Sequence, residues 1–493
     1  MIPFLILSHT SATFKSKNFS LILISQSFNK FSYIRVFKYI HRFKILLVIM
    51  NAKRKTVDTF ALPPGDTGLP FIGEALNLMK DPVAFSASRH QKYGSIFKTC
   101  VFGQPIIYVS GAKACQFVLS HEDEYFENKM LPNIEALIGK SSVTVQTGKK
   151  HQERRKVLRK VFSPRYLNEQ IDLIDRITES YLKRWIELEE FTWYSEFIDY
   201  SFDIACELFI GLENASKTPL KNLYQIWSRG LFSFSLPLPW TNLGRALKSR
   251  KEILLYVKNI ISERAKLNYS DNPKQDALSL MLNTCDDDNV LSEDEILDQI
   301  LNLLSAGHGT LASAFTSLCL LLGQNPDVLE KCRQEQQNFN DSNRITSSAL
   351  DRMNYLELVL KEVLRLIPPV GGGFRQVIKE CSFDGYRFPK GWRVIYSSSI
   401  THKDSSYFSF PEAFAPERFD EQFDVDAYFP FGGGRRRCLG ENLARLELKI
   451  FAAKLIGNYD WKFPEQTLEI EQLPFPHPKD NLRVNFDYLE LHK

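Results

Sequence analysis

A single cysteine has an unusual setting near the carboxyl end of the chain, in FPFGGGRRRCLGENLARLEL, residues 429–448. Cys438 follows three glycines and three arginines and precedes a helical pattern that begins after Gly440. The positive end of a helix and nearby cations lower the pKa of a thiol and favour the thiolate. Glycines 432–434 also let backbone N–H groups approach the sulfur. The pattern predicts an anionic cysteine ligand, with a redox-sensing cysteine or an ordinary surface loop as alternatives.

A second candidate site lies in a long helical pattern, residues 291–323, which Ser292 and Glu295 open as a capping box. At about 32 residues and about 1.5 Å each, this helix is close to 50 Å long. Its second half is apolar on all sides, so it must cross the interior. Within it, AGHGT (306–310) contains two glycines that each weaken a helix by about 1 kcal/mol. Close approach of a flat ligand, a kink that presents the Thr310 hydroxyl, or tight helix packing would each explain them.

Composition limits the class of protein. The 493 residues are 44% hydrophobic and 24% charged, which is typical of a globular chain with a large core. Residues 1–60 hold ten Lys or Arg and one acid, Asp58, so the remainder carries a net negative charge. An acidic body argues against a nucleic-acid partner. The eight cysteines form no C-x-x-C pair, which argues against zinc and a disulfide framework and favours a reducing compartment.

The chain divides into a basic, Ser-rich extension (1–49) and one domain (50–493). No apolar run in the extension reaches the roughly 18–20 residues of a membrane span. The extension resembles a transit peptide, or it precedes a true start at Met50. We therefore expect a soluble, cytoplasmic protein, with a plastid or mitochondrion as the alternative. Helical patterns dominate the domain, with strands near residues 93–110 and 385–399, so we predict a mainly α fold with small β-sheets.

The cysteine stretch resembles the haem-ligand signature of the cytochrome P-450 family, F-x-x-G-x-R-x-C-x-G. The fixed positions are matched by Phe431, Gly434, Arg436, Cys438 and Gly440. Two further family motifs follow the expected order: EVLR supplies Glu362 and Arg365, and PERF supplies Arg418. The resemblance covers residue 62 to the end. It implies the cytochrome P-450 fold, with haem between the long central helix and the helix of the cysteine loop, and a buried ion network of Glu362, Arg365 and Arg418.

The same resemblance implies haem b with the Cys438 thiolate as its axial ligand. Cations must hold the haem propionates. The family's W-x-x-x-R motif appears as His151 and Arg155, with His in the place of the aromatic residue. Arg375 in GGGFRQV and Arg436 match the other propionate contacts.

One departure concerns the family's oxygen-activation motif, A-G-x-[D/E]-T. Ala306, Gly307 and Thr310 match it, but Gly309 occupies the acidic position. In the family the Thr positions protons and water, and the acid relays protons. Loss of the acid is expected to lower the rate on the order of ten- to a hundredfold or more. A water beside Gly309, the neighbouring His308 or a polar group of the substrate would have to replace it. Otherwise the protein is an isomerase or lyase of oxygenated lipids, or a haem-binding or sensing protein without catalysis.

Within the family, PPGDTGLPFIGE, HQERRKVLRKVFSP and RLIPPVGGGFRQV resemble the retinoic-acid-hydroxylating branch and its soluble cyanobacterial relatives. The resemblance implies a monooxygenase that hydroxylates a lipophilic retinoid or other isoprenoid; composition does not separate these from a fatty acid or sterol. Residues 231–240 fall at the family's entrance loop, or form a core-facing turn. The pocket is expected to include Leu131, Ile134, Leu137, Ile138, Val370, Gly371 and Gly372.

The expected partners are O2, the substrate and an electron donor of the ferredoxin type that supplies two electrons. Cations of KKHQERRKVLRK, together with Arg435, Arg437 and Lys449, would form a basic docking patch, or simply a solvated face. We expect a monomer with at most peripheral membrane contact.

Overall fold

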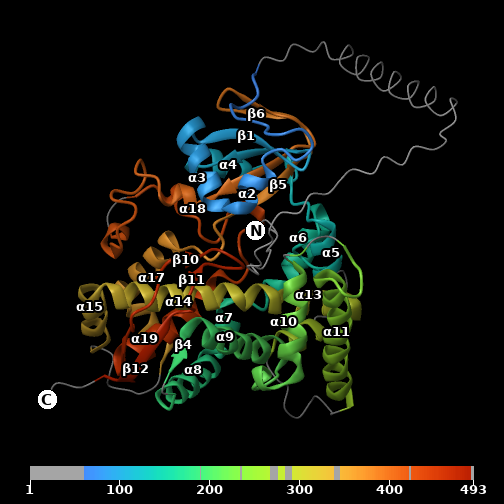
Figure 1. Ribbon diagram of the computed structural model, residues 1–493. Helices are drawn as coiled ribbons and strands as arrows, with labels where there is room; N and C mark the ends of the chain where they lie inside the picture. The colour runs from blue at the N-terminus through green and yellow to red at the C-terminus, as the bar shows by residue number, and fades with distance from the viewer. Residues whose placement is uncertain are drawn as a thin grey trace, which may run out of the picture.

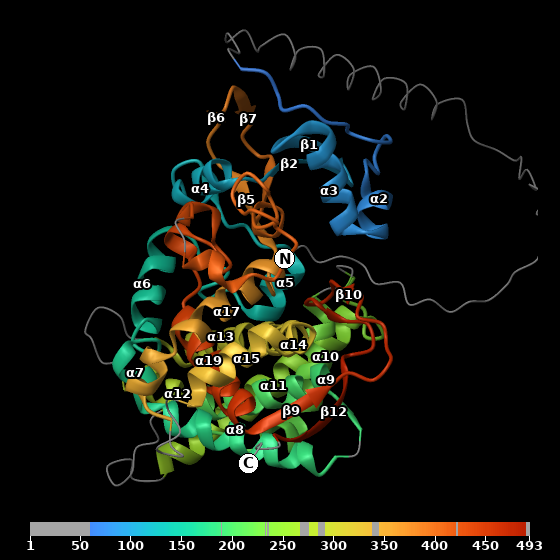
Figure 2. The ribbon, with the colours of Figure 1, turned by 90° about the vertical axis from the view of Figure 1, so that its left-hand side faces the viewer.

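The computed structural model describes residues 60–188, 190–231, 233, 236–266, 276–283, 291–337, 345–420 and 423–489. The extension 1–49 lies outside the described residues. A β-rich part at the top of Figure 1 rests on a larger helical part, and the view in Figure 2 shows the same two layers from the side. The predicted fold class, mainly α with small β-sheets, is confirmed.

Helices form most of the molecule. Those before the long central helix are α2 (Ala75–Lys80), α3 (Pro82–Tyr93), α4 (Ala112–Ser120), α5 (Pro132–Ile138), α6 (Gly148–Leu158), α7 (Pro164–Glu169), α8 (Ile171–Ile186), α9 (Trp193–Ile210), α10 (Pro219–Leu231), α11 (Asn242–Lys266) and α12 (Ala277–Leu282). The later ones are α13 (Glu293–Gly307), α14 (Gly309–Gln324), α15 (Pro326–Gln337), α16 (Ser347–Arg352), α17 (Asn354–Leu366), α18 (Ser398–Thr401) and α19 (Glu441–Asn458).

The largest sheet has the strand order β1-β2-β8-β5-β3. Its strands are β1 (Ile96–Val101), β2 (Gln104–Val109), β3 (Phe126–Glu127), β5 (Gly372–Val377) and β8 (Arg393–Ser397). The strands predicted near residues 93–110 are confirmed and form a hairpin: β1 and β2 are antiparallel with Val101 opposite Gln104, and Gly103 takes the left-handed backbone (φ 74°) that the tight turn needs. Within this sheet β2 and β8 pair in parallel, with Ile106 opposite Arg393.

Three small sheets complete the β structure of the described chain. β6 (Cys381–Phe383) pairs with β7 (Tyr386–Phe388), and β10 (Ile470–Glu471) pairs with β11 (His477–Pro478). The third has the order β4-β12-β9, from β4 (Phe191–Thr192), β12 (Arg483–Tyr488) and β9 (Tyr459–Lys462).

The predicted central helix exists, but it is interrupted. Ser292 and Glu295 form the predicted capping box at the start of α13. The chain departs from helical geometry at His308 (φ −102°, ψ −74°) and continues as α14. The stretch Glu293–Gln324 is long and apolar enough to cross a membrane, yet 72% of its most apolar window is buried inside the protein. It is therefore a core helix, with a kink at the AGHGT stretch.

Aromatic rings pack the second half of this helix, α14, against α9 and α19. Phe197 of α9, Phe315 of α14 and Phe451 of α19 are all fully buried. Their ring centroids lie 5.0–5.4 Å apart in each pair. Such ring pairs add about 0.5–1.5 kcal/mol each beyond the area that they bury. The position of α14 relative to α19, which begins directly after the cysteine loop, is thereby fixed.

Candidate haem site

The cysteine loop closes on itself just before α19. The Cys438 N–H donates to the Phe431 carbonyl at 3.0 Å, and Gly440 is the N-cap of α19. A backbone N–H of Gly440 reaches the Cys438 thiol, and a Cβ at Gly440 would lie 3.9 Å from the sulfur. The helix end therefore points at the sulfur as the sequence predicted.

Glycines 432–434 have a different role from the one predicted. Among the described residues, the backbone hydrogen bond to the thiol comes from Gly440. Gly434 instead has a left-handed backbone (φ 62°), and a Cβ there would come within 2.0 Å of the Leu119 carbonyl of α4. The glycine lets the loop pack directly against α4.

The Cys438 side chain is exposed on one side, although protein surrounds the site at longer range. This surrounding burial raises the pKa of the Cys438 thiol, while the Gly440 N–H, Arg155 and Arg437 act in the opposite direction. The predicted lowering of the thiol pKa is therefore wrong for the polypeptide alone, because desolvation outweighs the cations. A metal ion that binds the sulfur must displace its proton.

The predicted propionate contacts lie together next to the cysteine loop. The Arg155 guanidinium donates to the Arg437 carbonyl, and its buried Nε has no hydrogen-bond partner among the described residues. His151 of the same helix, α6, is buried, with 3% of its surface exposed. Burial, with Arg436 and Arg155 nearby, lowers the pKa of His151 to about 4, so the ring is neutral at pH 7. Helix α6 thus offers a neutral ring and a cation to the same region.

Arg375 and Arg436 come from two other segments and meet at a shared carboxylate. Glu122, two residues after α4, contacts the Nε of Arg375 at 2.6 Å and the Nε of Arg436 at 2.5 Å. Glu122 is not among the predicted site residues, because no motif marks the stretch LSHEDEYF in which it lies. The structure therefore brings His151, Arg155, Arg375 and Arg436 together, and adds a buried acid between the last two.

The Thr310 hydroxyl lies immediately after the kink. It donates to the Ala306 carbonyl at 2.7 Å, and its side chain is half-buried. Ala306 itself is exposed, although the residues of α13 before it are mostly buried. Of the alternatives for the glycines, the structure shows two: the helix is interrupted between Gly307 and Gly309, and both glycines pack closely against aromatic rings.

The place of the missing acid is filled by an aromatic ring. A Cβ at Gly309 would come within 2.4 Å of Cε2 of Phe475, which lies between β10 and β11. The water expected beside Gly309 therefore has no room on this side. Phe475 is not among the predicted site residues either, since nothing in LPFPHP links it to a residue 166 positions earlier.

His308 does not take the acid's place either. Its ring packs edge-on against Phe202 of α9 and Tyr224 of α10, with centroids 5.4 and 5.1 Å away. Burial lowers the pKa of His308 to about 4. Helical residues two apart point to different sides, so this ring is not directed along the Thr310 side chain. We interpret it as a packing residue.

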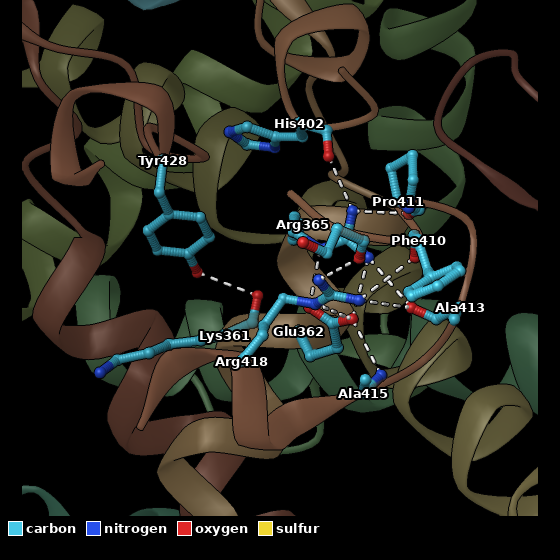
Figure 3. Close-up of polar contacts among 11 residues, drawn as sticks. Lys361, Glu362, Arg365, His402, Phe410, Pro411, Ala413, Ala415, Arg418 and Tyr428 are labelled. Atoms are coloured by element: carbon cyan, nitrogen blue, oxygen red, sulfur yellow. Dashed lines mark hydrogen bonds and ion pairs between the residues drawn. The ribbon is translucent and has the colours of Figure 1, made fainter. Parts of the chain in front are cut away.

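The predicted ion network is present on α17 and the segment after α18. Arg365 and Glu362 are fully buried and pair at 2.7 Å, and Arg418 Nε donates to Glu362 at 3.0 Å (Figure 3). Arg365 also donates to the carbonyls of His402 and Pro411, each at 2.7 Å. A buried pair of this kind is stable only when its remaining polar atoms are satisfied, as they are here.

This network is linked to the cysteine loop through one histidine. Burial lowers the pKa of His402 to about 3, so its ring is neutral. Its Nε2 accepts a hydrogen bond from the Phe429 N–H at 3.1 Å, at the start of the cysteine loop. The ion network thus fixes the backbone that carries Cys438.

The predicted pocket residues fall into two groups. Leu131 and Ile134 are half-buried at the start of α5, and Val370, Gly371 and Gly372 are half-buried where β5 begins. Leu137 and Ile138 instead belong to the main core, where Leu137 packs against Gly230 of α10. The half-buried group remains a candidate lining of the substrate pocket. Leu137 and Ile138 instead anchor α5 in the core. Trp240 of the predicted entrance loop is 73% exposed.

Comparison with known proteins identifies the family. The family model of cytochrome P450 matches residues 63–486. The chain therefore belongs to the cytochrome P450 family.

Similar proteins indicate which members of the family this chain resembles. A putative cytochrome P450 120 of Synechocystis is 43% identical over 88% of this chain and 98% of its own length. A solved structure, retinoic acid bound cyanobacterial CYP120A1, superposes with a TM-score of 0.82 at 43% identity and covers 88% of this chain and 100% of its own. Abscisic acid 8'-hydroxylase 4 of Arabidopsis thaliana is 31% identical over 90% of this chain and 96% of its own length. The chain is a cytochrome P450 monooxygenase, with haem held by a cysteine thiolate.

The described residues fit that cofactor. The open face of Cys438, the unpartnered Nε of Arg155 and the neutral His151 provide a ligand and donors for two propionates. When bound, the haem iron activates O2 so that one oxygen atom can enter a C–H bond of the substrate.

Proposed function

We propose that this chain hydroxylates a retinoid or a related isoprenoid acid at a haem bound by Cys438. The observation that carries the substrate class is the 43% identity, over 88% of the chain, to a protein solved with retinoic acid bound. A hydroxylase of abscisic acid among the relatives supports the same broad class of lipophilic acid. In this proposal His151, Arg155, Arg375 and Arg436 hold the propionates.

The residues above the haem would position the substrate and a proton. Ala306, Val370 and Leu131 offer apolar surface, which suits a long hydrocarbon chain. The Thr310 hydroxyl, which donates to the Ala306 carbonyl, would hold a proton or a water on the substrate side of the haem. Phe475 fills the acid's place beside Gly309, and His308 packs against aromatic rings. A polar group of the substrate would therefore relay the proton to this site.

The test is product analysis with all-trans-retinoic acid, isotopically heavy O2 and a ferredoxin-based electron supply. A hydroxylated product that carries one heavy oxygen is the expected result. A haem-loaded, reduced enzyme that gives no labelled product would overturn the substrate proposal. A product formed without electrons or label would instead favour an isomerase or lyase, which the hydroxylase relatives do not favour.

We propose that the electron donor is an acidic protein of the ferredoxin type that docks next to α6, and that the enzyme is a cytoplasmic monomer. Three cations of the predicted patch are paired: Arg435 with Asp123 at 2.9 Å, Arg437 with Glu441 at 2.6 Å and Lys449 with Glu357 at 2.9 Å. Lys149 is also paired, with Glu153 at 3.6 Å. Other exposed cations of α6 and the turn after it support a smaller docking area, namely Lys150, Lys156 and Arg159.

A further inference from the structure

Glu122 is a buried acid between two arginines. Its side chain is 1% exposed, and those of Arg375 and Arg436 are 5% and 9% exposed. The three residues come from the turn after α4, from strand β5 and from the cysteine loop. One carboxylate therefore ties together three segments that are distant in sequence.

The contacts leave one end of each guanidinium group available. Arg375 Nε forms an ion pair with Glu122 at 2.6 Å without hydrogen-bond geometry, and Arg375 donates Nη1 to the Phe374 carbonyl at 2.8 Å. Arg436 uses Nε on Glu122 and donates Nη2 to the Gln146 carbonyl at 2.7 Å. None of the hydrogen bonds among the described residues uses Nη2 of Arg375 or Nη1 of Arg436. Each planar group is thus held in place with one terminal nitrogen free for another acceptor.

Charge supports the same arrangement. Arg155, Arg375 and Arg436 bring three positive charges to the site, and two haem propionates would bring two negative ones. Since His151 is neutral at pH 7, it adds no further positive charge, and the Glu122 carboxylate compensates part of the charge of Arg375 and Arg436. Buried charges are stable when they are compensated and hydrogen-bonded.

We propose that Glu122 is a positioning residue for the haem propionates, acting through Arg375 and Arg436. It holds the two guanidinium groups so that their free terminal nitrogens meet the propionate oxygens. The inference rests on the proposed propionate contacts of these arginines. It is distinct from a simple structural ion pair, because it ties Glu122 to the charge of the propionates.

The experiment compares haem with haem dimethyl ester, whose esterified propionates carry no charge. Full-length protein is loaded with either compound, and the rate of transfer to excess apomyoglobin is measured for the wild type, E122Q and the control E124Q. Glu124 is exposed in the same segment, so E124Q makes the same chemical change away from the arginines. We expect the wild type and E124Q to retain haem much better than the ester. In E122Q this preference should fall by about tenfold or more, which is the effect of one charged hydrogen bond.

Other outcomes would overturn the proposal. If E122Q releases haem and haem dimethyl ester faster by the same factor, Glu122 only stabilises the fold. If E122Q prefers haem over the ester more strongly than the wild type does, Glu122 competes with the propionates for the arginines. If E122Q does not fold, E122D, which keeps the charge but shortens its reach, undergoes the same comparison. R375Q and R436Q serve as references. If they keep the full preference, the propionate contacts themselves are wrong, whereas loss of preference in them but not in E122Q or E122D rejects only the role of Glu122.

Discussion

At the scale of single residues, Cys438 shows that a helix end and cations do not by themselves produce a thiolate. The Gly440 N–H, Arg155 and Arg437 all favour the anion, but burial of the site has the larger effect on the thiol pKa. A metal that binds this sulfur would have to displace its proton. Arg155 and Arg437 would then stabilise the thiolate, and the open side of Cys438 would leave room for the metal.

Replacing Cys438 by Ser should abolish the spectrum that a thiolate gives to the reduced carbon monoxide complex, because a serine hydroxyl is a far weaker anionic ligand. The measurement is the absorption spectrum of the reduced, carbon monoxide-treated protein. Cys381→Ser is the control, since Cys381 lies in β6 and is half-buried. A thiolate spectrum that persists in C438S would contradict the ligand assignment.

His308 should make stability depend on pH. Burial lowers its pKa to about 4, while an unfolded histidine titrates near about 6.5. Between these values the unfolded chain binds more protons, so His308 contributes stability above pH 6.5 that is lost as the pH falls towards 4. His308→Phe keeps an aromatic ring against Phe202 and Tyr224 but does not titrate. Urea unfolding should show a shallower pH slope for H308F, by up to about 1.4 kcal/mol per pH unit. If the free energy of unfolding of the wild type and of H308F depends on pH with the same slope, His308 does not have the lowered pKa assigned to it.

At the scale of elements, the contact between the start of α14 and the β10–β11 connection explains why Gly309 is a glycine. Ala is normally better than Gly in a helix by about 1 kcal/mol, yet a Cβ at Gly309 would meet the Phe475 ring at 2.4 Å. G309A should therefore destabilise the protein by about 1–3 kcal/mol, the usual cost of overpacking. Denaturant unfolding measures the change.

The matched comparison separates packing from helix propensity. A Cβ at Gly457 in α19 would meet nothing within 4 Å, so G457A should stabilise by up to about 1 kcal/mol. In the F475A background, adding G309A should leave the free energy of unfolding nearly unchanged or raise it. An equal loss from G309A with and without Phe475 would rule out this ring as the cause.

The same contact shows where prediction from sequence ends. The capping box of α13, the hairpin of β1 and β2 and the helix after Gly440 follow from local patterns, and the structure contains all three. The positions of Phe475 and Glu122 do not, because each meets a partner that only the completed fold brings near. Glu122 and Arg436 are 314 residues apart. A signature motif identifies the ligand loop, but it contains no information about the distant side chains that pack around it.

At the scale of the whole molecule, the distribution of charge decides where an acidic electron donor can dock. Ion pairs neutralise most of the arginines beside the cysteine loop, including Arg437 with Glu441. The exposed cations that remain nearby lie on α6 and just after it, with Lys156 among them. Since α6 also carries His151 and Arg155, a donor bound there would be close to the haem edge.

Lys156→Glu should therefore slow the first electron transfer from an acidic ferredoxin several-fold at low ionic strength, because it replaces attraction by repulsion at the docking area. Lys462→Glu is the control: Lys462 is equally an exposed lysine, but it ends β9, a strand that lies far from α6 (Figure 2). Stopped-flow reduction under carbon monoxide gives the rate. At about 0.5 M salt, where screening acts within a few ångströms, the two variants should converge. If K156E and K462E behave alike at low salt, the donor docks elsewhere and the cations of α6 form only a solvated face.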